Sequence, residues 1–512
     1  MRIRIELLTG LAMLLAFTLR PVLVQAQTTT LERFEPINSR ITVDTSETWT
    51  FRAPEGEVLS FVVRATSGDL DPVLTITDSD SNRVISNDDY QYPDSRDSLL
   101  EAITVPKTDT FTVTVSGFSS TSGNYELSML PGYGDMVGIE NFNGALNLTS
   151  NVPVLSLEPG TGQAALALEG PHQRAIAIVN SIEPQSDFYA QVDVETVRGL
   201  NNGQFGWVVG MTARQTDDDH YYLLEIDHLG QWRFLVRTPE GETILRDWVS
   251  NPSIEDGATE FTLGMMANGA GFDFFFDGQF FGQIIDSTLT EPGSIGLVIE
   301  TTGLVSGSVD ARFDDLAVNR PILINGEHVV PQRLLGVNQI TLVQELRRRG
   351  MIPAQGDTAF SVPESFVEYP RGGVSEIVLG EGRSFGNFLL GSSVTWRIRG
   401  IGPAGCGILL HAQDDSNYTL AYLTQLGGYG VSQRTGDIFE PGIFGEQLVI
   451  GDAPYQFLII VRGETLYYYV NGQLAGSMPD SEIDGTIGSA VVNFEPLGTS
   501  CTFRDTWVWE WE

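Results

Sequence analysis

Two carboxylates stand at even spacing in the segment EIDHLG, which runs from Glu225 to Gly230. Even spacing on a strand puts both side chains on one face, and a retaining glycoside hydrolase needs an acid and a nucleophile about 5 Å apart. Glu225 and Asp227 could therefore cleave a glycosidic bond. The alternative, which we favour, is a pair of solvated carboxylates that face outward.

Clusters of acidic residues point to a second chemistry, the binding of calcium. Asp78, Asp80 and Asn82 alternate as EF-hand ligands do, but Arg83 stands where that loop needs glycine, and no glutamate occupies its twelfth position. The segment is therefore not an EF-hand. Shallower calcium sites are a hypothesis at two places, Asp69, Asp71 and Asp88, and Asp218 with Asp219; solvated acidic turns are the alternative, which we favour.

Aromatic residues with flat rings could stack on a sugar, provided that they are exposed. Trp232 and Tyr429 occupy equivalent positions just after a turn, and Trp511 lies near the end of the final strand. We predict a ligand role for these three. Trp507, Trp509 and Trp511 alternate on the face of that strand which also carries Cys501 and Phe503, so Trp507 and Trp509 are expected in the core.

Other catalytic patterns are absent from the sequence. Its five histidines form no HExxH pair, and no GxSxG, phosphate-binding loop or dinucleotide fingerprint stands between a strand and a helix. We therefore predict no catalytic residue and no enzymatic activity.

Charge and targeting signals narrow the partners and the compartment. The formal net charge is −37, which repels phosphate backbones, so nucleic acid is excluded as a partner. Residues 1–26 are typical of a secretory signal peptide, with Arg2 and Arg4 before an apolar stretch, and no later stretch is apolar enough to span a membrane. We expect a secreted or cell-surface protein, in which Cys406 and Cys501 form a disulfide; buried free thiols are the alternative.

The elements that carry these residues are almost all strands. Short alternating runs between Gly, Asp, Ser and Pro clusters recur about every ten residues from Leu31 onward, which is typical of a β-sandwich. Two later blocks look like copies of each other: HYYLLEIDHLGQWRFLVR from His220 matches NYTLAYLTQLGGYGVSQR from Asn417, and FDFFFDGQFFGQ from Phe272 matches LYYYVNGQLAGS from Leu466. The conserved order of these matches indicates a duplicated domain.

The second match predicts a β-hairpin in each copy. Asp277-Gly278 and Asn471-Gly472 are dipeptides that favour a tight type I′ turn. The strand before each turn alternates, so we expect one face of each to line a core: Phe272, Phe274 and Phe276 in the first copy; Leu466, Tyr468 and Val470 in the second.

Between the copies, residues 321–372 break the strand pattern. Thr341 and Gln344 resemble a capping box, and Gly350 with Pro353 ends the segment, which predicts one short helix. Arg347–Arg349 suit the negative end of the helix dipole, and a basic recognition patch is the alternative.

The first block resembles the bacterial pre-peptidase C-terminal domain. The segments that carry the resemblance are DPVLTITDSDSNRVISNDD from Asp71, DSLLEAITVP from Asp97 and TFTVTVSGF with SGNYELSM, ending at Met129. The resemblance implies a small non-catalytic sandwich, and calcium at acidic loops as in some members of the family.

The two later blocks resemble the concanavalin A-like lectin/glucanase sandwich in its laminin-G-like form. YYLLEIDHLGQWRF, FFFDGQFFGQ, GSIGLVIE and ARFDDLAV carry the resemblance, as do their echoes in the second copy. Glucanases of this fold have an ExDxxE motif, but here Gly230 stands where the second glutamate belongs, and the equivalent AYLTQL has no acid. The resemblance thus implies the fold and leaves the function open.

We therefore predict an all-β chain of three tandem β-sandwiches: residues 31–132 pre-peptidase-like, 135–320 and 373–512 concanavalin A-like, with 321–372 as a linker containing the short helix. The favoured function is non-catalytic binding of extracellular polysaccharide or a surface protein, with the duplication raising avidity if both copies engage one target. A glycoside hydrolase and a structural spacer without a ligand are the alternatives.

Overall fold

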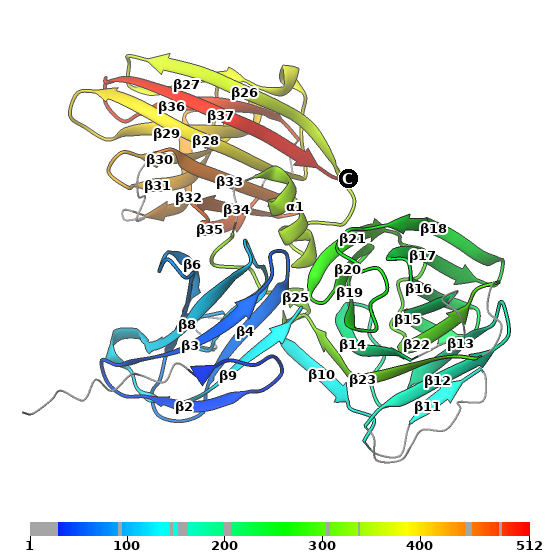
Figure 1. The fold of residues 1–512 in the computed structure, drawn as a ribbon. Coiled ribbons are helices and arrows are strands. Elements are labelled where there is room, and N and C mark those ends of the chain that lie inside the picture. The colour runs from blue at the N-terminus through cyan, green and yellow to red at the C-terminus, as the bar shows by residue number, and fades with distance from the viewer. Residues whose placement is uncertain are drawn as a thin grey trace, which may run out of the picture.

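The computed structural model describes residues 29–90, 95–143, 147–151, 162–197, 206–303, 308–335, 338–445, 453–480 and 484–512. The predicted signal peptide, residues 1–26, lies outside this range. The fold is all-β, and among the described residues one α-helix is present, α1, Gln339–Arg348. Figure 1 shows three β-sandwiches arranged around this helix, as the strand pattern predicted.

Sandwich 1 is the smallest of the three. Its core contains the alternating apolar residues of its two sheets, including Phe51, Phe61 and Phe111. One sheet has the order β1 (Thr29–Thr30), β3 (Ser46–Ala53), β8 (Asp109–Gly117), β5 (Pro72–Thr77), β6 (Arg83–Asn87), and the other β2 (Ile37–Ile41), β9 (Gly123–Pro131), β4 (Val58–Ala65), β7 (Ser98–Thr104).

Sandwich 2 consists of two larger sheets. We call the first its back sheet: β10 (Asp135–Glu140), β23 (Ser308–Arg320), β14 (Phe188–Val197), β19 (Glu260–Asn268), β20 (Gly271–Phe276), β21 (Gln279–Ile285), with β12 (Ala164–Glu169) also paired to β23. The other is its front sheet: β11 (Leu148–Ser150), β13 (Arg174–Val179), β22 (Ser294–Thr301), β15 (Trp207–Asp217), β16 (His220–Asp227), β17 (Gln231–Thr238), β18 (Gly241–Ser250).

Sandwich 3 has the same plan. Its back sheet is β26 (Asp357–Tyr369), β37 (Gly498–Glu510), β28 (Phe388–Arg399), β33 (Tyr455–Arg462), β34 (Thr465–Val470), β35 (Gln473–Pro479). Its front sheet is β27 (Gly373–Val378), β36 (Thr486–Asn493), β29 (Ala404–Asp414), β30 (Asn417–Thr424), β31 (Tyr429–Thr435), β32 (Ile438–Gly445). A two-stranded ribbon, β24 (Leu323–Ile324) and β25 (Glu327–His328), precedes α1.

The strand orders of sandwiches 2 and 3 correspond, except that β26 takes the place of both β10 and β12, and that β11 has no counterpart among the described strands of sandwich 3; this correspondence confirms the duplication. Irregular features also repeat: Asp277 and Asn471 share a positive φ in the two hairpin turns, and Arg214 and His411 share one at equivalent bulges. The predicted core faces are confirmed, since Phe272, Phe274 and Phe276 belong to one core and Leu466, Tyr468 and Val470 to the other.

The final strand, β37, departs from the prediction for its tryptophans. Cys501, Phe503 and Val508 lie in the core, whereas Trp507 and Trp509 pack outside it, against α1. A bulge at Asp505, with φ of 49°, inserts one residue and reverses the side-chain alternation. The expectation that Trp507 and Trp509 share the face of Cys501 is therefore wrong.

The linker differs from the prediction in two details. The N-cap of α1 is Asn338, whose side chain accepts a hydrogen bond from the Thr341 backbone N–H, and not Thr341 itself as the capping-box prediction required. Strand β26 lies inside the segment predicted as linker; its residues are mostly exposed, so its sequence carries little hydrophobic alternation.

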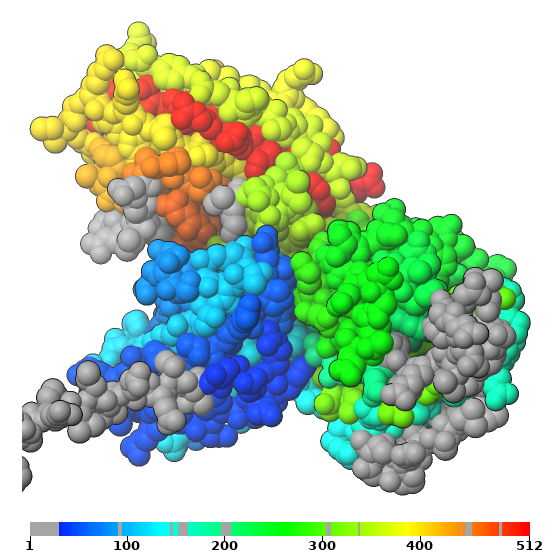
Figure 2. Space-filling model, viewed as in Figure 1, coloured from blue at the N-terminus to red at the C-terminus, as the bar shows by residue number. Residues whose placement is uncertain are grey.

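The three arginines at the end of α1 contact other parts of the chain, Arg347 through Gln283 at 2.9 Å, so the alternative of a recognition patch is wrong. Arg348 is 5% exposed and forms an ion pair of 2.5 Å with Asp273 of sandwich 2, while its Nη1 donates to Thr104 of sandwich 1. Arg349 pairs with the buried Glu345. Specific buried partners, more than the helix dipole, therefore hold these side chains. Figure 2 shows the three sandwiches in contact around this junction.

Glu101 makes the junction of sandwiches 1 and 2 sensitive to pH. Its Oε1 accepts hydrogen bonds from the backbone N–H groups of Gly134 and Ile322, and burial raises its pKa from 4.5 to about 7. The folded protein thus holds a proton on Glu101 that the unfolded chain releases at lower pH. The stability from this group is fully present below pH 4.5 and is lost as the pH rises through about 7.

We predict that Glu101→Gln, which keeps the acceptor and removes the charge, raises the free energy of unfolding at pH 8 by up to about 3 kcal/mol. At pH 4 the variant and the parent should be alike, because Glu101 is then protonated in both states. Denaturant titrations at the two pH values measure the difference. A gain of equal size at both pH values would contradict the assignment.

Cys406 of β29 and Cys501 of β37 form a disulfide, as predicted, and it joins the two sheets of sandwich 3. Within the described residues no helix is both long and apolar enough to cross a membrane.

Candidate functional site

The back sheets of sandwiches 2 and 3 are occupied by contacts with other parts of the chain. In sandwich 2, Tyr189, Met266 and Phe275 pack against Val58 and Tyr133 at the end of sandwich 1. In sandwich 3, Leu389, Ile460, Tyr469, Trp507 and Trp509 pack against the linker and α1. The outward faces of the two front sheets take no part in these clusters, and they are equivalent surfaces of the two copies.

An ion-pair network covers the front face of sandwich 2. Arg233 bonds to Glu225 and reaches Glu300 at 3.2 Å, while Arg174 bonds to Glu300 at 2.6 Å and to Glu242 at 2.5 Å. The guanidinium of Arg174 also lies 3.7 Å from Glu225, so Glu225 sits between two arginines.

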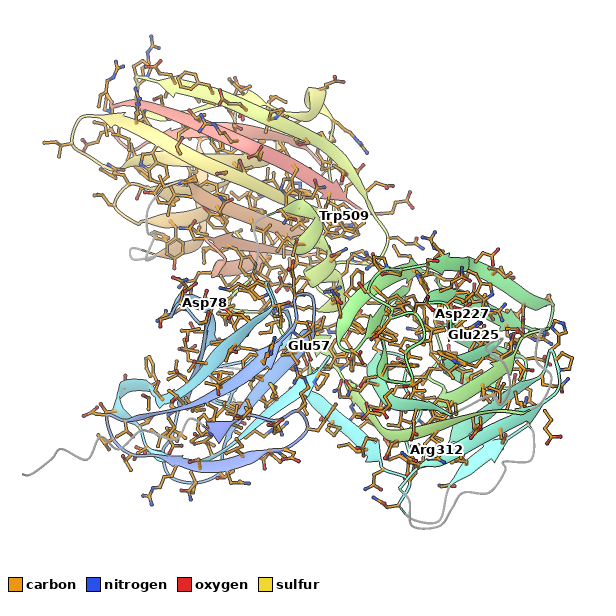
Figure 3. The ribbon with its side chains drawn as sticks, in the orientation of Figure 1. Glu57, Asp78, Glu225, Asp227, Arg312 and Trp509 are labelled. Carbon is orange, nitrogen blue, oxygen red and sulfur yellow. A yellow bond between two sulfur atoms is a disulfide. The ribbon has the colours of Figure 1, made fainter. Side chains whose placement is uncertain are left out.

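Neither carboxylate of the predicted hydrolase pair is free. Glu225 is 0% exposed; burial and the neighbouring Glu300 raise its pKa, which Arg174 and Arg233 oppose. Asp227 closes the turn after β16, where its Oδ1 accepts hydrogen bonds from the backbone N–H groups of Leu229 and Gln231. The pair lies on one strand (Figure 3), but the expectation of solvated carboxylates is wrong, because both are buried.

The equivalent face of sandwich 3 is aromatic. Tyr422 takes the position of Glu225 and leans over Gly430, where an added Cβ would lie 2.8 Å from its hydroxyl. Its ring is 5.7 Å from that of Phe494, which is 54% exposed, and Phe444 is paired with Gly430 on the neighbouring strand and is 66% exposed. Glycine at 430 therefore leaves room for a flat ring lying on the sheet.

A carboxylate stands on the same face. The register aligns Glu376 of β27 with Ala490, Gly407 and Tyr422 across four neighbouring strands. Among the described residues Glu376 Oε2 has no hydrogen-bond partner, and burial raises the pKa of this side chain, with a further contribution from Asp415. We call Glu376, Tyr422, Phe444 and Phe494 the aromatic face.

None of these four residues was predicted from the sequence. Trp232 and Tyr429, which were, lie at equivalent positions but pack against the two cores; Trp232 is 3% exposed and offers no ring face for stacking. The outward positions are the next residues along, Arg233 and Gly430, since side chains alternate on a strand. Trp511 is half-buried beside Trp509.

Several residues of the calcium prediction have protein partners. Asp69 accepts from the Ser122 backbone N–H, and Asp219 pairs with Arg237 at 3.0 Å. Burial raises the pKa of Asp71; the nearby Arg96 opposes this rise, and Asp88 adds to it. Over the described ranges no three His, Cys, Asp or Glu side chains are grouped to hold a metal ion. Calcium at Asp69, Asp71, Asp88, Asp218 and Asp219 stays a prediction.

The EF-hand-like segment instead receives an ammonium group. Lys107, the only lysine of the chain, lies 3.0 Å from both Asp78 and Asp109. Asp78 Oδ1 also accepts from the backbone N–H groups of Asp80 and Asn82, which closes the turn. The alternating acidic pattern that suggested a metal loop therefore serves an ion pair and a turn.

Comparisons with known proteins cover parts of the chain. No curated protein matches it. The carbohydrate binding module CBM66 from Bacillus subtilis matches 34% of the chain over 96% of its own length, at 18% identity and a TM-score of 0.27. The Bacillus licheniformis beta-glucanase matches 36% over 99% of its length, at 15% identity and a TM-score of 0.27. The Caenorhabditis elegans galectin LEC-6 matches 30% over 96% of its length, at 13% identity and a TM-score of 0.21. These scores are too low to argue from. Residues 45–117, within sandwich 1, match the family model of the bacterial pre-peptidase C-terminal domain, which confirms the resemblance stated for the first block.

Proposed function

We propose that the chain is a secreted, non-catalytic binding protein that recognises extracellular polysaccharide through the aromatic face of sandwich 3. The observation that carries the proposal is the ring of Tyr422, flat on the front sheet between the exposed Phe444 and Phe494. The C–H face of a pyranose stacks on such rings, and a neighbouring carboxylate accepts hydrogen bonds from its hydroxyls. Glu376 is the carboxylate on this face, three strands from Tyr422; its unpaired Oε2 is buried, so the side chain must turn outward to accept from a hydroxyl.

Charge narrows the class of polysaccharide. The chain carries a formal net charge of −37, and the carboxylate of Glu376 lies on the binding face itself. Both repel acidic sugars, so the proposed ligand is a neutral polysaccharide.

The two copies do not share this chemistry. Where sandwich 3 has Tyr422 and Gly430, sandwich 2 has Glu225 and Arg233, joined to Arg174 and its network. A ligand that stacks on the aromatic face finds no equivalent platform on sandwich 2. The proposal is therefore for binding at one copy, and not for avidity through both.

We predict that Tyr422→Ala weakens binding of a neutral polysaccharide about tenfold, which corresponds to ~1.4 kcal/mol. Retention on a glycan array, run with and without EDTA, measures it, and loss of retention in EDTA would also support the calcium prediction. Phe118→Ala is the matched control, because this ring is 51% exposed on sandwich 1, away from the face. Equal retention of both variants would contradict the proposed site. If the parent chain bound no glycan on the array, the alternative of a structural spacer without a ligand would be favoured.

The hydrolase alternative has its own test. The arginines that hold Glu225 and the turn that holds Asp227 support a structural role for both carboxylates. We expect no release of reducing ends from polysaccharides by the parent chain. Release that disappears in Glu225→Gln would overturn the non-catalytic proposal.

A further inference from the structure

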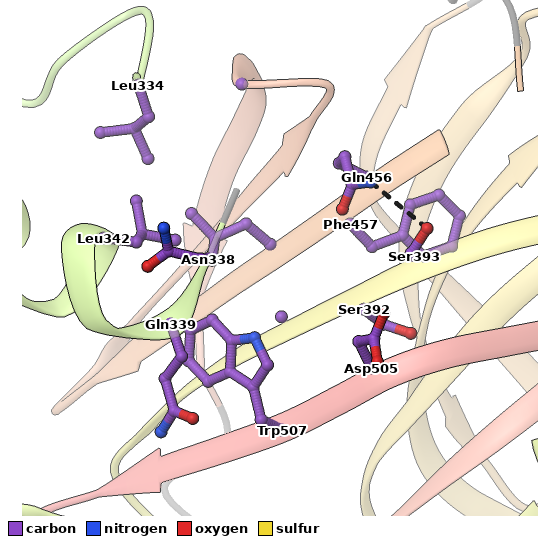
Figure 4. Close-up of a pocket in the computed structure, with 13 residues that line it drawn as sticks. Leu334, Asn338, Gln339, Leu342, Ser392, Ser393, Gln456, Phe457, Asp505 and Trp507 are labelled. Atoms are coloured by element: carbon purple, nitrogen blue, oxygen red, sulfur yellow. Dashed lines mark hydrogen bonds between the residues drawn. The ribbon is translucent and has the colours of Figure 1, made fainter. Parts of the chain in front are cut away.

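A cavity lies on the opposite side of sandwich 3, between its back sheet and the start of α1. Its volume is about 370 Å³, within the range of small-molecule sites, about 300–1,000 Å³. The linker contributes Leu334, Asn338, Gln339 and Leu342, and the sheet contributes Gln456, Asp505 and Trp507, among others (Figure 4). The aromatic face lies on the other sheet, so this cavity is separate from the site proposed above.

The bulge in β37 creates the cavity. Because Asp505 has a positive φ and adds one residue, Trp507 turns away from the core and toward the linker. Gly391 of the neighbouring strand leaves room for the indole, since an added Cβ would lie 2.5 Å from that ring. The other wall is held in place by backbone: Leu334 N–H donates to the carbonyl of Gly472 at 2.8 Å.

The polar groups of the cavity are mostly free acceptors. Within the described part of the chain the Asp505 carboxylate has no ion-pair or hydrogen-bond partner, and the indole N–H of Trp507 has no acceptor. Gln456 donates its amide to Ser393 at 3.3 Å and Gln339 donates its amide to Thr358 at 2.6 Å, which leaves both amide carbonyls free. A ligand must therefore supply several donors and at least one acceptor.

The charge of the residues that line the cavity excludes an anionic ligand. No Arg, Lys or His lines the cavity among the described residues, and the one charged side chain is Asp505. At the N-terminus of α1, the backbone N–H of Thr341 is not free to bind an anion, because it already donates to the Asn338 side chain. Leu334, Leu342 and Trp507 offer apolar surface for the C–H groups of a ligand.

We propose that this cavity binds a single neutral pyranose, with its hydroxyls donating to Asp505, Gln339 and Gln456 and one ring or hydroxyl oxygen accepting from Trp507. Several hydroxyls beside C–H faces match both the polar and the apolar walls. Because one wall belongs to the linker and the other to sandwich 3, the bound sugar stabilises the packing of α1 on the sheet.

The test uses the full chain with methyl glycosides of glucose, galactose and mannose, N-acetylglucosamine, and glucuronate as an anionic probe. Calorimetry should give saturable binding of at least one neutral sugar at one site, with a higher melting temperature in its presence. Glucuronate should bind at least tenfold more weakly, because Asp505 repels it. An oligosaccharide whose non-reducing end is the same sugar should bind as the methyl glycoside does if the cavity captures a chain end.

Asp505→Asn is the decisive variant, because asparagine tolerates the positive φ while losing the charge. We expect at least tenfold weaker binding in this variant and in Trp507→Phe, which loses the N–H. Asp315→Asn is the matched control, since Asp315 has a φ of 44° in the equivalent bulge of sandwich 2. Tyr422→Ala should leave this binding unchanged, so failure here and failure of the aromatic face are distinguishable.

Two results overturn the proposal. One is the absence of binding for every neutral sugar to the parent chain. The other is binding that Asp505→Asn and Trp507→Phe leave as tight as in the parent, which would place the sugar elsewhere.

Discussion

Replacing Arg348 with methionine should lower the free energy of unfolding by about 3–5 kcal/mol, the cost of breaking a buried ion pair from one side. Arg348 and Asp273 are each 5% exposed, and their ion pair is 2.5 Å long. Methionine fills a similar volume but leaves the carboxylate of Asp273 buried without its cation. Gln283 remains as its hydrogen-bond partner, at 2.7 Å, and Arg347, which bonds to Gln283, interacts with Asp273 only through space.

The effect should extend beyond one sandwich, because Arg348 touches two of them and supports contacts of α1 with all three. Its side chain bonds to Thr104 and Asp273, and its backbone carbonyl accepts from the Tyr133 hydroxyl at 2.8 Å. Just beyond it, Arg462 of sandwich 3 donates to the carbonyl of Gly350 at 2.7 Å. We therefore expect Arg348→Met to separate the unfolding of the sandwiches into resolved transitions in a calorimetric scan.

Arg504→Met is the control for Arg348→Met. Arg504 and its partner Glu364 are both more than half exposed, at 57% and 56%, so their pair should be worth less than about 1 kcal/mol. Denaturant titrations of both variants give the comparison. Equal losses in the two variants would mean that burial does not set the cost, and a loss below about 1 kcal/mol for Arg348→Met would rule out its role at the junction.

Much of the fold could be predicted because its signals are local. The alternation of Phe272, Phe274 and Phe276 before Asp277-Gly278 specifies a hairpin and its core face within seven residues. The same signals recur in the second copy, so the duplication could be recognised from the sequence and is confirmed by the matching strand orders.

The bulges could not be predicted in this way. Asp315 and Asp505 each add one residue to a long strand, and alternation counted across them gives the wrong face for every residue that follows. That error placed Trp507 in the core and hid the cavity beneath α1. The ARFDDLAV and CTFRDTWV segments do carry a sign of the bulge, an aspartate in mid-strand, where this residue is disfavoured.

The site residues on the front faces could not be predicted for a different reason. Trp232 and Tyr429 were chosen for their ring type, yet the alternation of their own strands already places them inside, beside Phe234 and Val431. The aromatic face is assembled from four strands or loops far apart in sequence, around Glu376, Tyr422, Phe444 and Phe494. Only the register of the sheet brings these residues together.

Removing the disulfide should cost sandwich 3 about 2–5 kcal/mol. The link between Cys406 and Cys501 closes a loop with a sequence separation of 95 residues and joins the front sheet to the back sheet. Sandwich 2 has no disulfide at the equivalent positions, where Val209 corresponds to Cys406 and Ala311 to Cys501. The double variant Cys406→Val, Cys501→Ala copies that pair and so avoids leaving free thiols in the core.

Thermal unfolding with and without a reducing agent measures this contribution. Reduction should lower the melting temperature of the parent chain by several degrees, whereas the double variant should melt at that lower temperature with and without the reducing agent. In the Arg348→Met background, where the transitions are expected to be resolved, that of sandwich 2 is the internal control, because no cysteine lies in it. If reduction left all transitions of the parent unchanged, the packing of Val394, Phe457 and their neighbours, and not the covalent link, would hold the two sheets together.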